Sequence, residues 1–132
     1  MIKYPVKIGK NEVKAAGIRL PISTKNSVIV CRKINKMKTE KAKKFLQEMI
    51  EGKRSINRKY YTKTCKEILK VLESAEKNAK NMGIEKTVIK TISVEKGERR
   101  LRMKRRRSFG SELKNTNIKI VLKKDGENES KK

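Results

Sequence analysis

The stretch TVIKTISVEKGERRLRMKRRRSFGSELKNTNIKIVL, residues 87–122, carries the pattern that decides the fold. At its two ends apolar residues alternate with polar ones: Val88, Ile92 and Val94 in the first part, and Ile118, Ile120 and Leu122 in the second. A period of two is typical of β-strands that bury one face. These parts are therefore predicted to be antiparallel strands, joined by an insertion that is too long for an ordinary hairpin loop.

The insertion between these strands is strongly cationic. Seven of the nine side chains from Arg99 to Arg107 are basic and none is acidic. Its sizeable apolar groups are few, namely Leu101, Met103, Phe109 and Leu113. Such a segment does not build a core of its own. We expect a projecting two-stranded extension over about residues 95–117, reaching roughly 35 Å if both arms are extended.

Three interpretations of this cationic run compete: a solvated surface, a nuclear-localisation patch, and a site for a polyanion. Two like charges about 4 Å apart repel by roughly 1 kcal/mol even in water. A localisation signal needs only a short basic run and has no need of strands that hold both ends. Most of the cations are arginines, which bind phosphate in a bidentate manner and stack on bases. Phosphate neutralisation is therefore the favoured interpretation.

The net charge of the whole chain also favours a polyanionic partner. The 132 residues include 38 basic and 14 acidic side chains, for a net charge of +24. A charge of this size favours a nucleic-acid partner, with a free-standing nucleic-acid regulator and a membrane-surface protein as other possibilities. No stretch approaches 18 apolar residues, and the N-terminus lacks the apolar region of a secretory signal.

Catalytic and metal-binding residue types are missing or scattered. The chain has no histidine, and Cys31 and Cys65 are 34 residues apart, which argues against Cys/His zinc ligation. We expect two buried free thiols in a reducing compartment, with a disulfide as the alternative. No glycine-rich phosphate loop and no paired acid and base are present. The sequence therefore predicts a protein that is not an enzyme and uses no cofactor and no metal.

Upstream of residue 87 the pattern predicts one strand and three helices. Residues 13–22 alternate through Ile18, Leu20 and Ile22, which indicates a short strand that ends near Pro21. Ser23 or Thr24 is the expected N-cap of a helix of about three turns. Thr39 is the expected cap of a second helix, ended by Gly52, with an apolar stripe of Ala42, Phe45, Leu46, Met49 and Ile50.

The third predicted helix runs from about Thr62 to Met82 and is ended by Gly83. Thr64 and Glu67 have capping-box spacing, so Thr64 is an alternative start. Its apolar stripe consists of Cys65, Ile68, Leu69, Leu72, Ala75, Ala79 and Met82. The predicted fold is α+β, with a small antiparallel three-stranded sheet packed on three helices and a long basic β-hairpin extension. It forms one domain over residues 1–132, with core and extension over 13–123 and a disordered tail over 124–132.

A second basic segment joins the second and third predicted helices. It combines cations with aromatic residues, a mixture that suits contact with an RNA backbone and stacking on bases. The candidate residues are Lys53, Arg54, Arg58, Lys59, Tyr60, Tyr61 and Lys63. The alternative is that the tyrosines close the entry of the third helix against the core, and the two roles are compatible.

Five segments in this order resemble a known family: VKAAGIRLPIS, KINKMKTEKAKKFLQEM, KTCKEILKVLESAEKNAKNMGI, TISVEKGERRLRMKRRRSFG and NTNIKIVL. They are similar to the universal large-subunit ribosomal protein numbered twenty-two, the protein whose hairpin lines the polypeptide exit tunnel. The resemblance covers about residues 13–123. The amino-acid sequences of the predicted helices are more similar to archaeal and eukaryotic members than to bacterial ones.

This resemblance implies a structural role in the cytoplasmic large ribosomal subunit. The implied partners are large-subunit ribosomal RNA, neighbouring ribosomal proteins and the nascent polypeptide, without a membrane or a small-molecule substrate. The implied RNA-binding residues of the extension are Arg99, Arg100, Arg102, Lys104, Arg105, Arg106, Arg107 and Lys114. The implied tip at the exit tunnel consists of Arg102, Met103, Lys104, Arg105 and Arg106.

Overall fold

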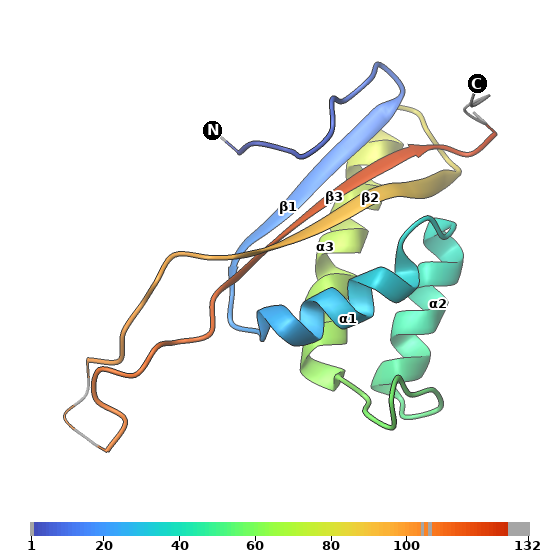
Figure 1. Ribbon diagram of the computed structural model, residues 1–132. Coiled ribbons are helices and arrows are strands. Elements are labelled where there is room, and N and C mark those ends of the chain that lie inside the picture. Colours follow the sequence, from blue (N-terminus) through green and yellow to red (C-terminus); the bar gives the residue numbers. More distant parts are fainter. Residues whose placement is uncertain (1, 104, 106, 127–132) are drawn as a thin grey trace.

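Strands and helices follow one another along the chain in the order β1 (Glu12–Leu20), α1 (Thr24–Ile34), α2 (Thr39–Ile50), α3 (Thr62–Asn81), β2 (Thr87–Lys96) and β3 (Thr116–Lys124). This order comes from a computed structural model, which describes residues 2–103, 105 and 107–126 (Figure 1). Lys104 and Arg106 of the predicted extension lie outside the described residues. So do residues 127–132 of the predicted tail.

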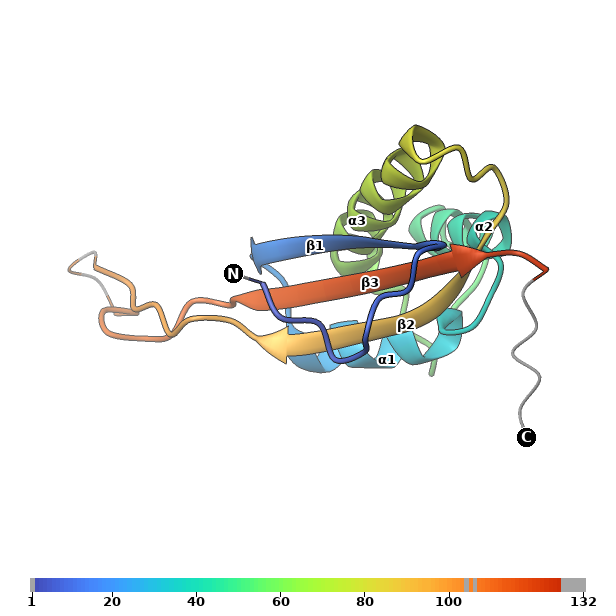
Figure 2. The same cartoon turned by 90° about the horizontal axis from the view of Figure 1, so that it is seen from above.

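The sheet has the strand order β1-β3-β2, and both neighbouring pairs are antiparallel. β3 is central, and Ile120 faces Ala15 of β1 on one side and Ile92 of β2 on the other. Figure 2 shows the sheet in front and the helices behind it, on one face. The predicted α+β fold, with a three-stranded antiparallel sheet packed on three helices, is confirmed for the described residues.

The core lies between the sheet and the helices. Ile118, Ile120 and Leu122 of β3 are fully buried, as the alternation in the sequence predicts. The stripes of α2 and α3 pack against them, with Leu46 and Leu72 also fully buried. Burying an aliphatic side chain of this size contributes about 1.5–3 kcal/mol. Cys31 and Cys65 are buried free thiols, as predicted.

A β-bulge in β2 changes which of its residues face the core. The register with β3 shifts between Ile89 and Thr91, so that Lys90 is an extra residue. Ile89, opposite Leu122, is therefore fully buried, whereas the predicted core residue Val88 is only partly buried. The alternation from Val88 was wrong because a bulge moves every preceding side chain to the other face.

Lys90, the extra residue of the bulge, forms an ion pair with another strand of the sheet. Its Nζ lies 2.5 Å from a carboxylate oxygen of Glu12, at the start of β1. Burial on its own would raise the pKa of Glu12, but the hydrogen bonds from Lys90 and from the Gly9 amide outweigh burial and lower the pKa. The bulge thus ties the two edge strands of the sheet together across β3.

A second irregularity ends β1. The register with β3 shifts between Gly17 and Leu20, and Arg19 has a positive φ of 58°. Ile18 consequently points away from the helices and is 45% exposed, although the sequence predicted it for the core. β1 starts at Glu12, one residue before the predicted segment, and ends at Leu20, next to Pro21, as predicted, and Ile22 beyond its end is buried.

The chain before β1 crosses the outer face of the sheet (Figure 2). There Ile2, Tyr4 and Pro5 border a shallow hollow together with Ile18 and Lys119. Lys14 Nζ lies 5.3 Å from the centre of the Tyr4 ring, within range of a cation–π contact. This cover provides apolar neighbours for Ile18 on the face of the sheet that lies away from the helices.

The helix caps agree with the sequence in part. Ser23 caps α1, and its Oγ accepts from the amide of Asn26 at 3.5 Å, as predicted. Thr39 does not cap α2, because its hydroxyl donates to the carbonyl of Thr87 at 3.0 Å. The cap position of α2 belongs to Lys38, which makes no side-chain cap.

The ends of α3 also differ from the predicted pattern. It begins at Thr62 after Tyr61, which has a left-handed backbone, so the alternative start at Thr64 was wrong. At its other end Gly83 has a φ of +79°, and the Ile84 amide donates to Ala79, which closes the helix in a Schellman motif. Met82 lies beyond the last turn and is 55% exposed, so its assignment to the core stripe was wrong.

The extension projects from the end of the sheet where β2 stops and β3 starts (Figure 1). Its two arms are joined by few backbone hydrogen bonds, including Leu113 N–H to Arg100 at 2.8 Å and Arg102 N–H to Ser111 at 3.0 Å. An isolated bridge pairs Leu101 with Glu112. Among the described residues of the predicted 95–117 hairpin, the arms therefore lie side by side without a continuous ladder.

At the opposite end of the sheet, Lys124 is the last residue of β3. The Asp125 amide donates to the carbonyl of Lys86 at 3.0 Å. Lys124 thus belongs to β3, and Asp125 lies in the turn that follows it, at the start of the tail predicted over residues 124–132. Of the helices described, none combines the length and the apolar character that crossing a membrane requires.

Candidate nucleic-acid interface

Most cations of the extension have no acidic partner among the described residues. The exceptions are Arg99 and Lys96, which share one carboxylate, and Arg99 Nε lies 2.7 Å from Glu112. Glu112 also pairs with Lys96 at 3.4 Å, and Glu98 pairs with Arg19 at 3.1 Å. Glu98 and Glu112 are thus both paired with cations near the base of the extension. Because these ion pairs are exposed, each contributes at most about 1 kcal/mol to stability. Unpaired positive charge is left on Arg100, Arg102, Arg105, Arg107 and Lys114.

The end of the extension carries a hydrogen-bonded turn. Ser108 accepts from both the amide and the hydroxyl of Ser111, at 3.1 and 2.6 Å. Gly110 has a φ of +75°, which glycine adopts without strain, and its amide donates to Arg102. Phe109 lies on this turn and is 63% exposed, whereas Met103 on the facing arm is 83% exposed. The turn therefore displays an aromatic ring among arginines.

The basic segment between α2 and α3 is brought partly into the core and partly to the surface. Ile56 is buried, and Tyr61 packs against the core, which agrees with the structural alternative for this tyrosine. Tyr60 is 48% exposed. Asn57 and Arg58 have positive φ angles and form a tight turn between them. The segment therefore serves folding as well as any surface role.

In the basic segment between α2 and α3, two of the predicted RNA-binding cations are paired with carboxylates in α2 or directly after it. Lys53 Nζ lies 2.7 Å from Glu51, and this hydrogen bond raises the pKa of Lys53. Arg54 Nε lies 2.9 Å from Glu48, and its guanidinium lies over the Phe45 ring. Arg58, Lys59 and Lys63 have no such partner among the described residues. The unpaired charge of this segment is thus concentrated toward α3.

The base of the extension forms a hollow against the body, with a volume of about 260 Å³. We call it the basal hollow. It is lined by Arg19, Pro21, Lys63, Arg100, Arg102, Leu113, Lys114 and Asn115. The lining thus contains five cations and no carboxylate. It brings predicted residues of the extension together with Lys63 of the other basic segment, which are remote in the sequence.

Arg19 is a residue of this hollow that the sequence did not single out. It lies at the end of β1, and its amide donates to Asn117 Oδ1 at 3.0 Å. Its left-handed backbone turns the chain at this point. No local signal in the sequence marks such a position, because it depends on the register of β1 against β3. Phe109 was recognised only as one of the few apolar groups of the insertion.

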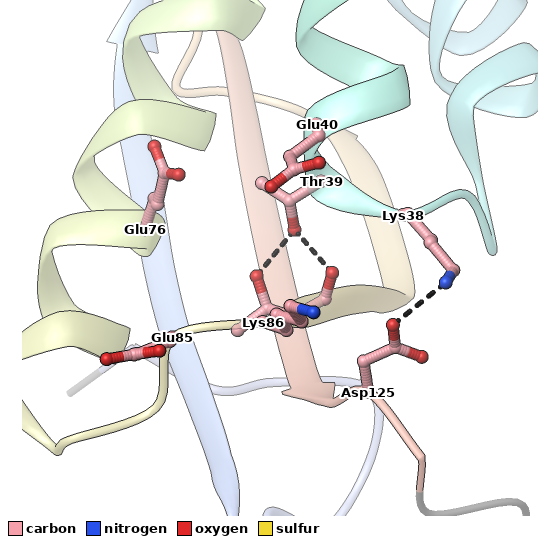
Figure 3. A pocket seen from close by; sticks show the side chains of 8 residues that line it. Lys38, Thr39, Glu40, Glu76, Glu85, Lys86 and Asp125 are labelled. Atoms are coloured by element: carbon pink, nitrogen blue, oxygen red, sulfur yellow. Dashed lines mark hydrogen bonds and ion pairs between the residues drawn. The ribbon is translucent and has the colours of Figure 1, made fainter.

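The opposite end of the body has a hollow of contrasting charge (Figure 3). It is lined by Glu40, Glu76, Glu85 and Asp125, with Lys38 and Lys86. Lys38 pairs with Asp125 at 3.0 Å, and Glu76 pairs with Lys43 at 2.8 Å. Within the described residues, no group of histidine, cysteine, aspartate and glutamate has an arrangement that holds a metal ion. The two ends of the sheet thus differ in charge.

A small α+β body with unpaired cations on one projecting arm, among the described residues, defines a class, that of small basic α+β proteins with a cationic extension. The family comparison narrows this class. Residues 15–123 match the family described as ribosomal protein L22p/L17e.

Curated archaeal relatives agree with the family match. A protein of Methanocaldococcus jannaschii named large ribosomal subunit protein uL22 is 34% identical, with 73% of this chain and 76% of the relative covered. The protein of the same name from Methanosphaera stadtmanae is 36% identical, covering 69% and 71%. That from Archaeoglobus fulgidus is 35% identical, covering 64% and 68%.

The chain belongs to the ribosomal protein L22p/L17e family, and its relatives place it in the archaeal branch. The resemblance read from the sequence is thereby confirmed. This family consists of structural proteins without enzymatic activity, so the chain is a structural ribosomal protein and not an enzyme.

Proposed function

We propose that this protein is a constituent of the cytoplasmic large ribosomal subunit that binds large-subunit ribosomal RNA through its extension and the neighbouring basic surface. The partners in this proposal are the RNA, adjacent large-subunit proteins and the nascent polypeptide. The names of the archaeal relatives, large ribosomal subunit protein uL22, support the assembly.

The observation that carries the RNA-binding proposal is the unpaired charge of the extension. Arg100, Arg102, Arg105 and Arg107 lie within eight positions of the chain and have no acidic partners among the described residues. Their mutual repulsion opposes a fixed arrangement. Phosphates relieve this repulsion, and arginine binds them with two parallel hydrogen bonds. RNA thus supplies the stabilisation that the extension does not obtain from apolar burial.

The tip at the end of the extension is proposed to line the polypeptide exit tunnel. Arg102, Met103 and Arg105 are its described members, and Lys104 and Arg106 are proposed with them. The support is the resemblance of the sequence to the exit-tunnel family and the distance of this segment from the body (Figure 1). Exposed Met103 offers the nascent chain an apolar contact among cations.

The proposal is tested by the salt dependence of binding to fragments of large-subunit ribosomal RNA. With six to ten phosphate contacts, the affinity is expected to fall roughly 10³- to 10⁵-fold between 50 and 200 mM salt. A flat titration would contradict phosphate binding. Tagged protein expressed in its own cells is expected to sediment with large subunits, whereas a free-standing nucleic-acid regulator would not.

A further inference from the structure

The basal hollow gathers like charges that the fold does not neutralise. Its cations come from the end of β1, the start of α3 and both arms of the extension. Only Arg19 has an acidic partner among the described residues, and that partner, Glu98, lies on the extension itself. Convergent cations without carboxylates are costly in an empty site and favourable around an anion.

The shape of the basal hollow suits an extended anionic chain rather than a single ion. A second hollow of about 170 Å³ adjoins it, and the two share Pro21, Lys63 and Lys114 in their linings. This second hollow reaches Ser23 of α1 and Thr62 of α3, and its lining also contains no carboxylate. A continuous depression between the extension and the body therefore offers more than one place for negative charge.

The start of α3 adds backbone donors to this depression. No side chain caps the helix, so the amides of its first turn have no capping acceptor. Amides at a helix N-terminus carry partial positive charge and favour phosphate oxygens. They supplement the five cations of the hollow, which carry the argument.

We propose that the basal hollow binds consecutive phosphates of one RNA strand that passes between the extension and the body. This proposal rests on the proposed RNA-binding function and names a particular site for it. Partly exposed Leu113 and exposed Pro21 lie beside the cations and provide apolar contact for ribose or base. An acidic peptide would use the charges but not these apolar groups.

The bound strand would also set the direction of the extension. Among the described residues the Arg19–Glu98 ion pair joins the extension to β1, whereas the backbone hydrogen bonds of residues 98–114 join the two arms of the extension to each other. Phosphates held jointly by Lys63 of the body and by Arg100 or Arg102 of the extension would bridge the parts.

Charge reversal at Lys63 tests this site, with Lys66 as a matched control. Both residues are exposed on the first turns of α3, but only Lys63 lines the hollow. Glutamate near a helix N-terminus is favourable, so neither Lys63→Glu nor Lys66→Glu is expected to unfold the protein. Both changes alter the net charge equally, which separates a local site from general attraction.

The probe is a short single-stranded oligouridylate added to the full chain. Lys63→Glu is expected to weaken its binding roughly tenfold and to lower the salt slope by about 0.7, whereas Lys66→Glu has a much smaller effect. Amide NMR signals of Thr62, Lys63 and Lys114 are expected to shift first in the titration of the wild type.

Three outcomes would overturn the site. Equal losses in the two variants would show general attraction, and the proposed function would survive. Equally tight binding of polyglutamate at the same amides would show that any acidic chain is accepted. Wild-type protein that fails to bind any RNA, including ribosomal RNA fragments, would remove the proposed function together with the site.

Discussion

Gly97 donates its amide hydrogen to the carbonyl of Asn115 at 2.9 Å, and this hydrogen bond joins the two arms where the sheet ends. The Asn115 side chain is buried against Gly97, and its Nδ2 donates to Glu98 at 2.7 Å. A Cβ on residue 97 would come within 2.6 Å of Asn115 Oδ1. The base of the extension therefore requires a residue without a side chain.

Gly97→Ala is expected to destabilise the protein by about 1–3 kcal/mol, because the added methyl group forces Asn115 out of its place. Urea unfolding measures the change. Gly9→Ala is the control, since a Cβ there would meet only Glu12 at 3.7 Å. In the double variant Gly97→Ala/Asn115→Ala the clash is removed, so the two costs should be less than additive. Additive costs would show that the contact is unimportant.

Replacing residues 98–114 by an Asn-Gly turn is expected to leave the body folded, because none of the buried apolar residues comes from this segment. Far-ultraviolet circular dichroism is expected to retain the helical signal, and the melting temperature to change little. Ribosomal RNA affinity and incorporation into large subunits are expected to fall sharply. Loss of the helical signal would mean that the extension contributes to the core after all.

Phe109→Ala is expected to weaken RNA binding by about 1–3 kcal/mol, the range found for stacking of a base on an aromatic ring. Because no charge changes, the slope of affinity against salt should stay the same. Phe109→Tyr, which keeps the ring, is the matched control. An unchanged affinity in Phe109→Ala would show that the ring does not contact RNA, and a changed salt slope would indicate a rearranged turn.

The two thiols predict a loss of stability in alkali. Burial raises the pKa of Cys31 from its ordinary value of 9.0 to about 12, with a further contribution from Cys65, whose own pKa burial raises to about 11. Above pH 9 the thiols ionise in the unfolded chain while the folded chain keeps them protonated. The stabilisation is therefore complete below pH 9 and is lost as the pH rises from 9 toward 12.

Urea unfolding at several pH values from 8 to 11 measures this loss. The double variant Cys31→Ala/Cys65→Ala should show a shallower decline, although its stability at pH 8 is lower because the buried sulfur atoms are missing. Lysine deprotonation affects both proteins alike. Equal slopes would contradict the role of the thiols, as would rapid thiol alkylation of the folded wild type.

Periodic segments of the chain were predicted well. The stripe from Ala42 to Ile50 and that from Cys65 to Ala79 require only that one face of each helix be apolar, and both are buried except for the partly buried Ile50 and Leu69. The alternation of Ile118, Ile120 and Leu122 likewise predicts the central strand. Such patterns repeat over several residues, so that one exception does not change their meaning.

Single positions were predicted poorly where a long-range contact competes with a local preference. Thr39 has the residue type of a cap, yet its hydroxyl bonds to Thr87, which is 48 positions away. Val88 follows the alternation, yet the bulge at Lys90 puts Ile89 in the core. Ile18 follows the alternation, yet the register shift of β1 against β3 turns it to the outer face, where it borders a hollow with Ile2 and Tyr4 of the N-terminal segment.

For the candidate interface, the amino-acid sequence by itself determined that a strongly cationic segment without acidic residues, 99–107, lies between two strands, because charge and periodicity are local properties. Only the tertiary structure decided which cations meet. Arg19, Lys63 and Lys114 converge on one hollow because β1 pairs with β3 and α3 packs behind them. Such convergence depends on strand register and helix packing, in which residues far apart in the chain act together.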